Sequence, residues 1–228
     1  MSETVAFSKH SVNVFFHILT KCNLTCAHCY INPGQHGKNT LSVDTITAWL
    51  QLFVNKTRNA NLILLGGEPT LHPDLDKCVK AAREMGYSSI TIDTNGYLFH
   101  DILNKIAPQD IDFLSFSLDG ATPKTNDRIR GNGCYDQCVS GIRQAVDRGF
   151  KTSLIFTVSN ENIHELHMMP DLLSRLGVTR FFIQVIGIRG KSREKSADSE
   201  KNQLQVDHNT WMTLIPSVAD QAAELGIT

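Results

Sequence analysis

The chain has 228 residues, of which 41% are hydrophobic and 20% are charged, so it can bury a sizeable core. Its formal net charge of -1 gives no basis for bulk attraction to nucleic acid or anionic lipid, and we expect neither as a partner. No run approaches the roughly 18 apolar residues of a membrane helix, and the N-terminus, MSETVAFSKH, lacks a signal sequence, so we expect a cytoplasmic protein.

Strand-like and helix-like segments alternate along the chain. The first predicted strand covers Val12–Leu19, which is rich in β-branched and aromatic residues. Later strands are predicted at Asn61–Leu65, Ser88–Asp93, Ile111–Ser117, Thr152–Val158 and Thr179–Ile186. Helices are predicted at Ser42–Leu50, Pro73–Met85, Leu98–Ile106, Tyr135–Arg148, Ile163–Leu176 and Asp207–Leu225. Between the last strand and the last helix, the polar stretch Arg189–Ser196 is expected to be a mobile loop.

This alternation predicts an α/β fold. Six strand–helix units at a period of about 35 residues indicate parallel strands joined by right-handed crossovers. A full barrel has eight such units, so we expect a partial (β/α)6 TIM-like barrel, an open parallel sheet with outer helices. Periodicity leaves an open doubly wound sheet as the alternative. We expect residues 1–11 to be an N-terminal extension and residues 12–228 to form one core domain.

Three of the six cysteines lie in one run directly after the first strand. Cys22, Cys26 and Cys29 have the spacing C-x3-C-x2-C and are followed by Tyr30. Three thiolates this close can hold a metal centre, and they are one short of the four that close a cubane iron–sulfur cluster. An open coordination position is what separates a catalytic metal site from a structural one. Because there is no secretory signal, disulfides are not expected.

The remaining cysteines carry weaker signals. Cys78 lies on a predicted helix and is expected to be a small buried hydrophobe. Cys134 and Cys138 are four residues apart on a predicted helix and share a face, but two ligands are too few for a closed site. A second cluster there stays an open alternative. His28 lies between two of the clustered cysteines and is expected to fill the loop, with metal ligation as its alternative role.

Unusual residues follow the other strands as well. Gly66-Gly67-Glu68-Pro69 follows the second strand, where the glycines allow close approach of a ligand and Glu68 adds a carboxylate. The turn Thr94-Asn95-Gly96 follows the third strand, Ser117 and Asp119 end the fourth, and Ser159-Asn160 follows the fifth. In both candidate architectures ligands bind at the carboxyl ends of the strands. These loops therefore predict a single site on one rim.

Some of these side chains have a predicted chemistry. Ser117 and Asp119 lie on the same side if the strand geometry continues, so both can hydrogen-bond a sugar hydroxyl; a turn cap is the alternative. Arg130 can pair with a carboxylate by bidentate hydrogen bonds, with a solvated loop arginine as the alternative. Gln184 and Arg189 point toward the same rim without a stated partner.

The cysteine run with Tyr30, together with the Gly66-Gly67-Glu68-Pro69 turn, resembles the radical S-adenosylmethionine (SAM) superfamily, over about Val12 to Ile188. The resemblance implies a [4Fe-4S] cluster held by the three cysteines, with SAM chelating the fourth iron. It also implies roles around SAM: the amine is received by Gly66, Gly67 and Glu68, the ribose lies near Ser117 and Asp119, the carboxylate is held by Arg130, and the adenine lies near Tyr30 and Asn160.

The resemblance further implies the reaction. The reduced cluster cleaves SAM to methionine and a 5′-deoxyadenosyl radical, which abstracts a hydrogen atom from a peptide or cofactor-precursor substrate. A reductant such as flavodoxin or ferredoxin is the implied partner. The cofactors carry the hard chemistry, while the protein orients and shields them.

A finer likeness concerns the branch whose members carry a C-terminal SPASM or twitch domain, which includes peptide maturases, sulfatase-maturing enzymes and haem-pathway enzymes. No cysteine follows Cys138, so we expect either a core domain without that C-terminal domain, which we favour, or a minimal enzyme. Two other functions stay open. One is an iron–sulfur electron-transfer or sensor protein without turnover, and the other is a structural zinc module that uses His28 as its fourth ligand.

Overall fold

The structure is a computed structural model that describes residues 11–56, 59–97, 101–193 and 204–228. The predicted N-terminal extension, residues 1–11, therefore lies outside the described residues except for Ser11, and so does the start of the helix predicted at Leu98–Ile106. Within the described ranges, no helix is both long enough and apolar enough to cross a membrane.

Six parallel strands form one sheet in the order β1-β2-β3-β4-β5-β6. The strands are β1 (Val12–Leu19), β2 (Ala60–Gly66), β3 (Ser89–Thr94), β4 (Phe113–Ser117), β5 (Thr152–Val158) and β6 (Arg180–Val185). Because spatial order follows chain order, the sheet curls in one direction, whereas a doubly wound sheet reverses its order at a switch point. The partial barrel is confirmed, and the doubly wound alternative is wrong.

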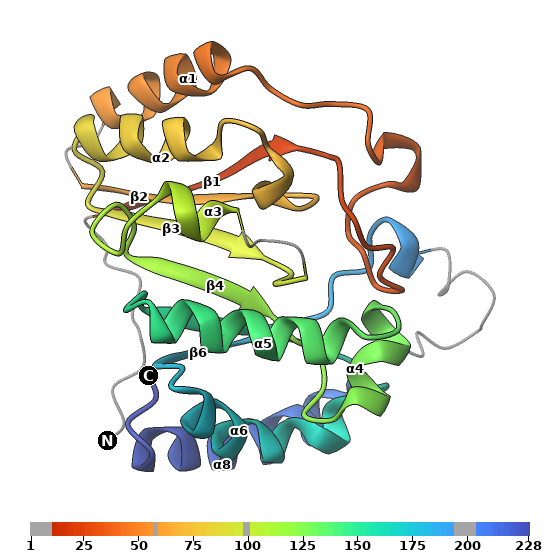
Figure 1. Ribbon diagram of the computed structural model, residues 1–228. Helices are drawn as coiled ribbons and strands as arrows, with labels where there is room; N and C mark the ends of the chain where they lie inside the picture. The colour runs from red at the N-terminus through yellow and green to blue at the C-terminus, as the bar shows by residue number, and fades with distance from the viewer. Residues whose placement is uncertain (1–10, 57–58, 98–100, 194–203) are drawn as a thin grey trace.

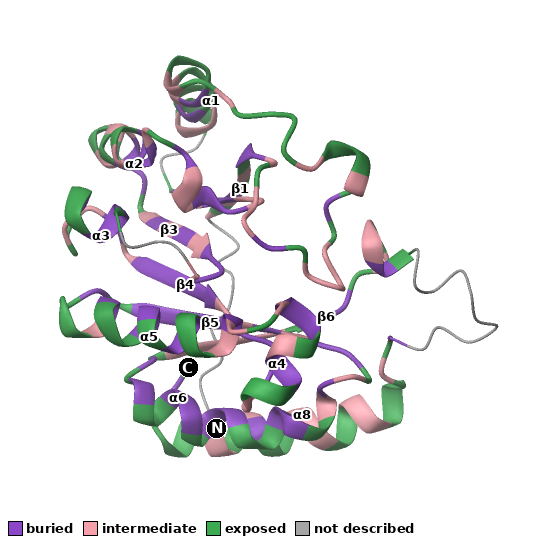
Figure 2. Ribbon diagram, turned by 45° about the vertical axis from the view of Figure 1, so that its right-hand side comes forward, coloured by how far each residue is buried: buried purple, intermediate pink, exposed green. Residues whose placement is uncertain are grey.

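Helices cover the outer face of this curled sheet (Figure 1). They are α1 (Val43–Lys56), α2 (Leu75–Glu84), α3 (Ile102–Lys105), α5 (Cys134–Asp147), α6 (Met169–Leu176) and α8 (His208–Glu224). The predicted helix at Ile163–Leu176 is a 3-10 helix up to Met168 and an α-helix from there on. Their outer faces are exposed and their inner faces are buried against the strands (Figure 2).

One helix, α4 (Pro123–Arg130), occupies a segment that the sequence had indicated as a loop. Thr122 caps its start by accepting a hydrogen bond from the backbone N–H of Thr125, and Pro123 stands in the first turn, where a missing N–H costs nothing. Gly131 ends it with a φ of 123°. The prediction failed because the helix is almost entirely polar, so it has no apolar periodicity to detect.

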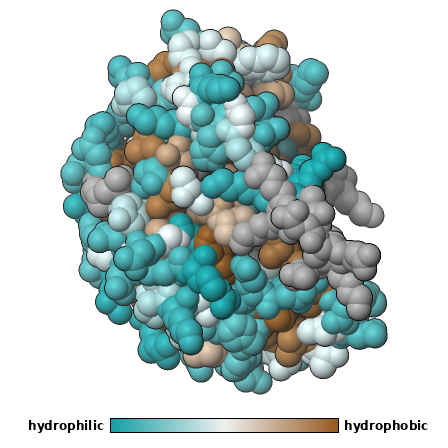
Figure 3. Space-filling model, turned by 90° about the vertical axis from the view of Figure 1, so that its right-hand side faces the viewer, coloured by the Kyte–Doolittle hydropathy of each residue, from teal (hydrophilic) through white to brown (hydrophobic). Residues whose placement is uncertain are grey.

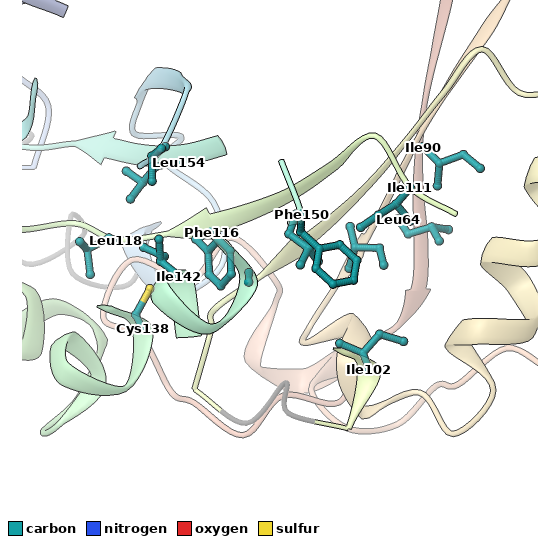
Figure 4. Packing of buried hydrophobic residues seen from close by; sticks show 14 of the residues in the cluster. Leu64, Ile90, Ile102, Ile111, Phe116, Leu118, Cys138, Ile142, Phe150 and Leu154 are labelled. Atoms are coloured by element: carbon teal, nitrogen blue, oxygen red, sulfur yellow. The ribbon is translucent and has the colours of Figure 1, made fainter. Parts of the chain in front are cut away.

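Strands β1 to β5 bury residues of one face against the helices and turn the other face toward the interior of the half-barrel, whereas the edge strand β6 has only partly buried and exposed residues. Leu64, Phe116 and Leu154 belong to the outer face and are fully buried, as Figure 4 shows. The residues that alternate with them on β3 and β5, including Asp93 and Thr157, line the interior. The period of two that defines a strand thus separates an apolar core from a cavity wall that mixes polar and apolar side chains.

The outer-face core gives a stability prediction. We expect Phe116→Ala to lower the free energy of unfolding by about 3–5 kcal/mol, because the side chain is fully buried and its loss leaves a cavity. Urea denaturation of the iron-free protein measures this. Phe15→Ala is the matched control, since Phe15 is a strand phenylalanine that is 61% exposed. Equal losses in the two variants would contradict the assignment of the core to the outer face.

Candidate functional site

A cavity of about 580 Å³ lies where the strands end, inside the half-barrel. Figure 3 looks at this side of the molecule and shows hydrophobic patches surrounded by hydrophilic atoms. The cavity wall brings together most of the residues predicted to form a site: Cys22, Cys26, Cys29, Tyr30, Gly66, Gly67, Glu68, Ser117, Arg130, Gln184 and Arg189. The prediction of a single site on one rim therefore matches the arrangement of the wall.

The three clustered cysteines are partly buried, unpaired thiols that face this cavity. The Cys22 sulfur accepts a hydrogen bond from the backbone N–H of Leu24 at 3.4 Å and one from Asn95 Nδ2 at 3.8 Å. Burial raises the pKa of Cys22 to about 11 and also raises that of Cys26. Because metal ligands are thiolates, binding of a metal centre here must displace protons.

The three clustered cysteines do not form a preformed site for a single ion. Within the described part of the chain, no three His, Cys, Asp or Glu side chains converge closely enough to hold one metal ion. A tetrahedral zinc ion needs such convergence, since each sulfur lies about 2.3 Å from the metal. A cubane cluster spreads its thiolates over separate irons. The structural zinc module with His28 as its fourth ligand stays an untested alternative.

The glycine turn after β2 holds the start of the cysteine loop. A Cβ on Gly66 would lie 2.3 Å from the carbonyl oxygen of Leu19, and one on Gly67 would lie 2.2 Å from that of Lys21. The backbone N–H of Gly67 donates to Leu19 at 3.0 Å, and that of Glu68 donates to Lys21 at 2.9 Å. The sequence suggested close approach of a ligand; the structure adds close approach of the chain itself.

Glu68 connects this turn to the end of β3. Its Oε1 accepts hydrogen bonds from the Thr70 backbone N–H, the Thr70 hydroxyl and the Thr94 hydroxyl, and its Oε2 accepts one from the Asn95 N–H at 2.7 Å. Burial raises the pKa of Glu68, although these bonds oppose the shift. Asn95 Nδ2 donates in turn to Asn23 Oδ1 at 2.9 Å. Asn95, in the turn that follows β3, thus contacts the cysteine loop.

Asp119 is fully buried and pairs with two cationic or potentially cationic side chains. Its Oδ2 lies 2.6 Å from Arg130 Nε and 3.0 Å from His28 Nε2. Burial alone would raise the pKa of Asp119, but Arg130 and His28 hold it well below its usual range. The backbone N–H of Ala27 donates to the carbonyl of Ile129 at 2.8 Å, so the last turn of α4 lies directly against the cysteine loop.

Two predicted site residues lie outside the cavity wall. Asp119 stands behind it, with Arg130 between its carboxylate and the cavity. Asn160 is exposed, and its Nδ2 donates to the carbonyl of Gln205 at 2.8 Å. Tyr30, by contrast, is on the wall, where its hydroxyl donates to the Gly66 carbonyl at 3.5 Å. No sequence pattern links Asp119 to Arg130, because their contact depends on the unpredicted helix α4.

The segment after β6 packs on the cysteine loop, although the sequence suggested a mobile loop from Arg189 to Ser196. A Cβ on Gly190 would lie 2.5 Å from the carbonyl oxygen of Cys29, so the two backbones touch. The Lys191 N–H donates to that oxygen at 3.0 Å, and Lys191 Nζ donates to the Thr25 carbonyl at 3.1 Å. Residues 194–196 lie outside the described residues.

The other three cysteines are buried away from the cavity wall. Cys78 is fully buried in the hydrophobic core, as predicted. The Cys138 thiol donates to the Ser117 carbonyl at 3.7 Å. Since the described residues offer no third ligand beside Cys134 and Cys138, a second cluster on this helix is not supported.

Asp93 is a wall residue that sequence analysis missed. It is the inward-facing residue near the end of β3, paired in register with Ser115 of β4, whose hydroxyl hydrogen-bonds it. Burial raises the pKa of Asp93 to about 7, the nearby Glu68 carboxyl adds to the shift, and the Ser115 bond opposes it. The sequence did contain a signal for this residue. In β3, polar residues alternate with isoleucines, and Asp93 is the acidic residue of the polar face.

Comparison with protein families identifies one match. The chain matches the model of the Radical SAM superfamily over residues 17–173, which is more than half of its length. The matched region begins before the cysteine loop and ends within α6, so it contains the cavity wall from His17 to Thr157.

Curated relatives share this region. A "Probable GTP 3',8-cyclase" of Saccharolobus solfataricus is 29% identical over 185 residues, covering 81% of this chain and 59% of the relative. An "Fe-coproporphyrin III synthase" of Methanosarcina barkeri is 30% identical over 213 residues, covering 90% of this chain and 53% of the relative. The chain thus spans between half and three-fifths of the length of these relatives.

Solved structures share the fold at low sequence identity. Streptococcus suis SuiB bound to S-adenosylmethionine superposes with a TM-score of 0.74 at 17% identity, over 93% of this chain and 48% of SuiB. The enzyme anSMEcpe with bound AdoMet and the Cp18Cys peptide superposes with a TM-score of 0.70 at 15% identity, over 92% of this chain and 58% of anSMEcpe.

The raised pKa of Asp93 gives a pH prediction. Between about pH 4 and pH 7 the folded protein keeps a proton that the unfolded chain loses, so stability falls as pH rises through this window. Asp93→Asn stays neutral in both states, so it should melt at a higher temperature than the wild type at pH 8, with the gap shrinking toward pH 5. Thermal unfolding followed by circular dichroism checks this; a gap independent of pH would contradict it.

The residues present fit the cofactors of the matching family, a [4Fe-4S] cluster and SAM. Three thiolates face one cavity together with the glycine turn and Arg130. Asn23 Nδ2 and His28 Nδ1, which flank the cysteines, are buried without hydrogen-bond partners among the described residues. Such orphaned polar atoms indicate that a bound group completes the site. By its family match and its cavity, the chain belongs to the radical SAM superfamily.

Proposed function

We propose that the chain cleaves SAM reductively at a [4Fe-4S] cluster held by Cys22, Cys26 and Cys29, giving a 5′-deoxyadenosyl radical that takes a hydrogen atom from a substrate. The observation that carries this proposal is that the three cysteines, the glycine turn and Arg130 line one cavity. Three thiolates leave one iron of a cubane cluster without a protein ligand, which suits a cofactor that must bind there directly.

Around this centre we assign binding roles to the wall residues. The Gly66-Gly67-Glu68 turn receives the SAM amine, since Glu68 holds the turn rigidly through four hydrogen bonds. Arg130 holds the SAM carboxylate, Ser117 the ribose, and Tyr30 lies beside the adenine. Asp119 near the ribose and Asn160 near the adenine stay predictions, because both lie outside the wall.

The rival function, an electron carrier or sensor without turnover, requires a fourth protein ligand to close the cluster. Cys22, Cys26 and Cys29 face the cavity, whereas Cys134 and Cys138 are buried beside α4 and β4. A substrate-sized cavity beside the cysteines also has no use in a carrier that only exchanges electrons. Both observations favour the enzyme.

For the substrate, the cavity wall favours a peptide over a nucleotide. The wall presents the Asp93 carboxyl and the exposed side chains of Gln184 and Arg189, while its other arginine, Arg130, is paired with Asp119. A triphosphate such as the GTP named for the cyclase relatives carries several negative charges that this wall does not complement. A peptide, such as the precursor in the SuiB complex, offers N–H donors to Asp93 and Gln184.

The remaining parts of the proposal concern partners. Reductive cleavage needs one electron, which we assign to a donor such as flavodoxin or ferredoxin. That residues 12–228 form one core domain continued by a SPASM or twitch domain stays a prediction.

The reaction is tested directly. We expect the protein, reconstituted anaerobically with iron and sulfide, reduced with dithionite and given SAM, to form 5′-deoxyadenosine, measured by liquid chromatography. Cys22→Ala, Cys26→Ala and Cys29→Ala variants should form none, because each loses a cluster ligand. An intact, reduced cluster in the wild type without this product would overturn the enzymatic function and favour the carrier.

Glu68 gives a second prediction. We expect Glu68→Ala to weaken SAM binding about tenfold or more while leaving most of the cluster assembled, because four hydrogen bonds that hold the turn are lost. Equilibrium dialysis measures SAM binding, and iron content measures the cluster. Glu84→Ala, an exposed glutamate at the end of α2, is the control and should bind SAM normally. Unchanged affinity in Glu68→Ala would remove Glu68 from the site.

A further inference from the structure

The ion pair behind the cavity wall involves one carboxylate oxygen and two partners from different elements. Asp119 Oδ2 lies 2.6 Å from Nε of Arg130, the last residue of α4, and 3.0 Å from Nε2 of His28, which lies between the second and third clustered cysteines. The side chain of Asp119 is 0% exposed, and those of Arg130 and His28 are 10% and 14% exposed. Water therefore screens these contacts only weakly.

Asp119 itself is held on every side. Its Oδ1 accepts a hydrogen bond from the Thr157 N–H of β5 at 2.7 Å, its N–H donates to Asn126 Oδ1 at 2.9 Å, and its carbonyl accepts from Asn162 Nδ2 at 3.0 Å. The position of its carboxylate is therefore fixed by the half-barrel, and the side chains of Arg130 and His28 contact it there.

The contact with Arg130 determines which edge of the guanidinium faces the cavity. A guanidinium is planar and presents its donors in a fixed fork, so a carboxylate oxygen held 2.6 Å from Nε limits the directions in which the two terminal nitrogens can point. Arg130 lines the cavity, and within the described residues its terminal nitrogens have no hydrogen-bond partner. They are left to bind a carboxylate in the bidentate geometry that such a fork matches.

The contact with His28 attaches the cysteine loop to the same fixed point. The backbone supports this attachment on the neighbouring residue, since the Ala27 N–H donates to the Ile129 carbonyl at 2.8 Å. The segment that carries the second and third cysteines is thus tied to the end of α4 by both side chain and backbone.

We propose that Asp119 is a positioning residue that acts through Arg130 and His28, aiming the guanidinium at the SAM carboxylate and fixing the cysteine loop against the barrel. This inference rests on the proposed function, since it needs SAM in the cavity. It differs from a ribose contact because Asp119 would act on SAM only through Arg130 and the cysteine loop.

The first test separates the two roles by ligand. Asp119→Asn is loaded with its cluster, and the dissociation constants of SAM and of 5′-methylthioadenosine, which has the ribose and adenine but no amino-acid carboxylate, are measured by equilibrium dialysis. We expect SAM to bind about tenfold to a hundredfold more weakly and 5′-methylthioadenosine to bind within about twofold of the wild type. The change that SAM induces in the electron paramagnetic resonance spectrum of the reduced cluster should need correspondingly more SAM.

The matched control is Glu165→Gln. Glu165 is a buried carboxylate that holds the other end of α4, through the Thr122 hydroxyl at 2.7 Å and the Thr125 hydroxyl at 2.6 Å. The substitution Glu165→Gln weakens the contacts of the same helix but leaves Arg130 and His28 unchanged, so SAM binding should stay within about twofold of the wild type. Equal weakening in both variants would show that helix stability alone matters, and would overturn the proposal.

A second pair of variants keeps the proposal testable if Asp119→Asn folds poorly. Arg130→Lys retains the charge but loses the fork, so it should weaken SAM and spare 5′-methylthioadenosine in the same way. The double variant Arg130→Gln/Asp119→Asn should bind SAM about as weakly as Arg130→Gln alone. The reason is that Asp119 acts on SAM through Arg130, so its loss has little further effect once Arg130 is gone. Independent, additive losses would overturn the Arg130 part.

The His28 part has its own readout. Release of iron to a chelator should be several-fold faster in Asp119→Asn and His28→Leu than in the wild type, and unchanged in Glu165→Gln. Unchanged iron release in Asp119→Asn and His28→Leu would overturn the role of His28.

The binding measurements on Asp119→Asn have two further outcomes that would overturn the proposal. Weaker binding of 5′-methylthioadenosine would restore the ribose contact, and tighter SAM binding would show that Asp119 only reduces the charge of Arg130. A wild type that binds no SAM would instead count against the proposed function.

Discussion

The close approach between the cysteine loop and the glycine turn is the constraint on which the site depends. The carbonyl oxygens of Leu19 and Lys21 occupy the space that side chains on Gly66 and Gly67 would need. This contact places the first cysteine beside the end of β2, and Glu68 then links the same turn to the end of β3. The cysteine loop and the residues around the glycine turn are therefore positioned by one backbone packing arrangement.

The strands were predictable because they depend on local patterns. All six were found, since each is a short apolar, β-branched run, whereas their order needed the structure, because parallel crossovers fit a doubly wound sheet as well. The three clustered cysteines were singled out by their spacing, and their role as cluster ligands stays a prediction. Helix α4 was missed because its polar sequence lacks periodicity, although Thr122, Pro123 and Gly131 were the signals of a start and an end.

The parts of the site that escaped prediction are contacts between residues far apart in the chain. Asp119 meets His28 and Arg130 only because the fold brings the end of β4, the cysteine loop and α4 together. The prediction that Ser117 and Asp119 lie on the same side rested on continued strand geometry, whereas β4 ends at Ser117. Asp93 needed the register of β3 against β4, which a single sequence does not contain.

The packing of Gly190 against the backbone of Cys29 has a consequence for the mechanics of the half-barrel. The sheet itself is open, because β1 and β6 are its two edges and do not pair. At the rim, however, the segment after β6 is hydrogen-bonded to the loop after β1. The two edge strands are therefore connected through these loops, although the strands themselves do not pair. A change in the separation of β1 and β6 is therefore coupled to the position of Cys29. A molecule bound between these edge strands that moved them apart would also displace Cys29.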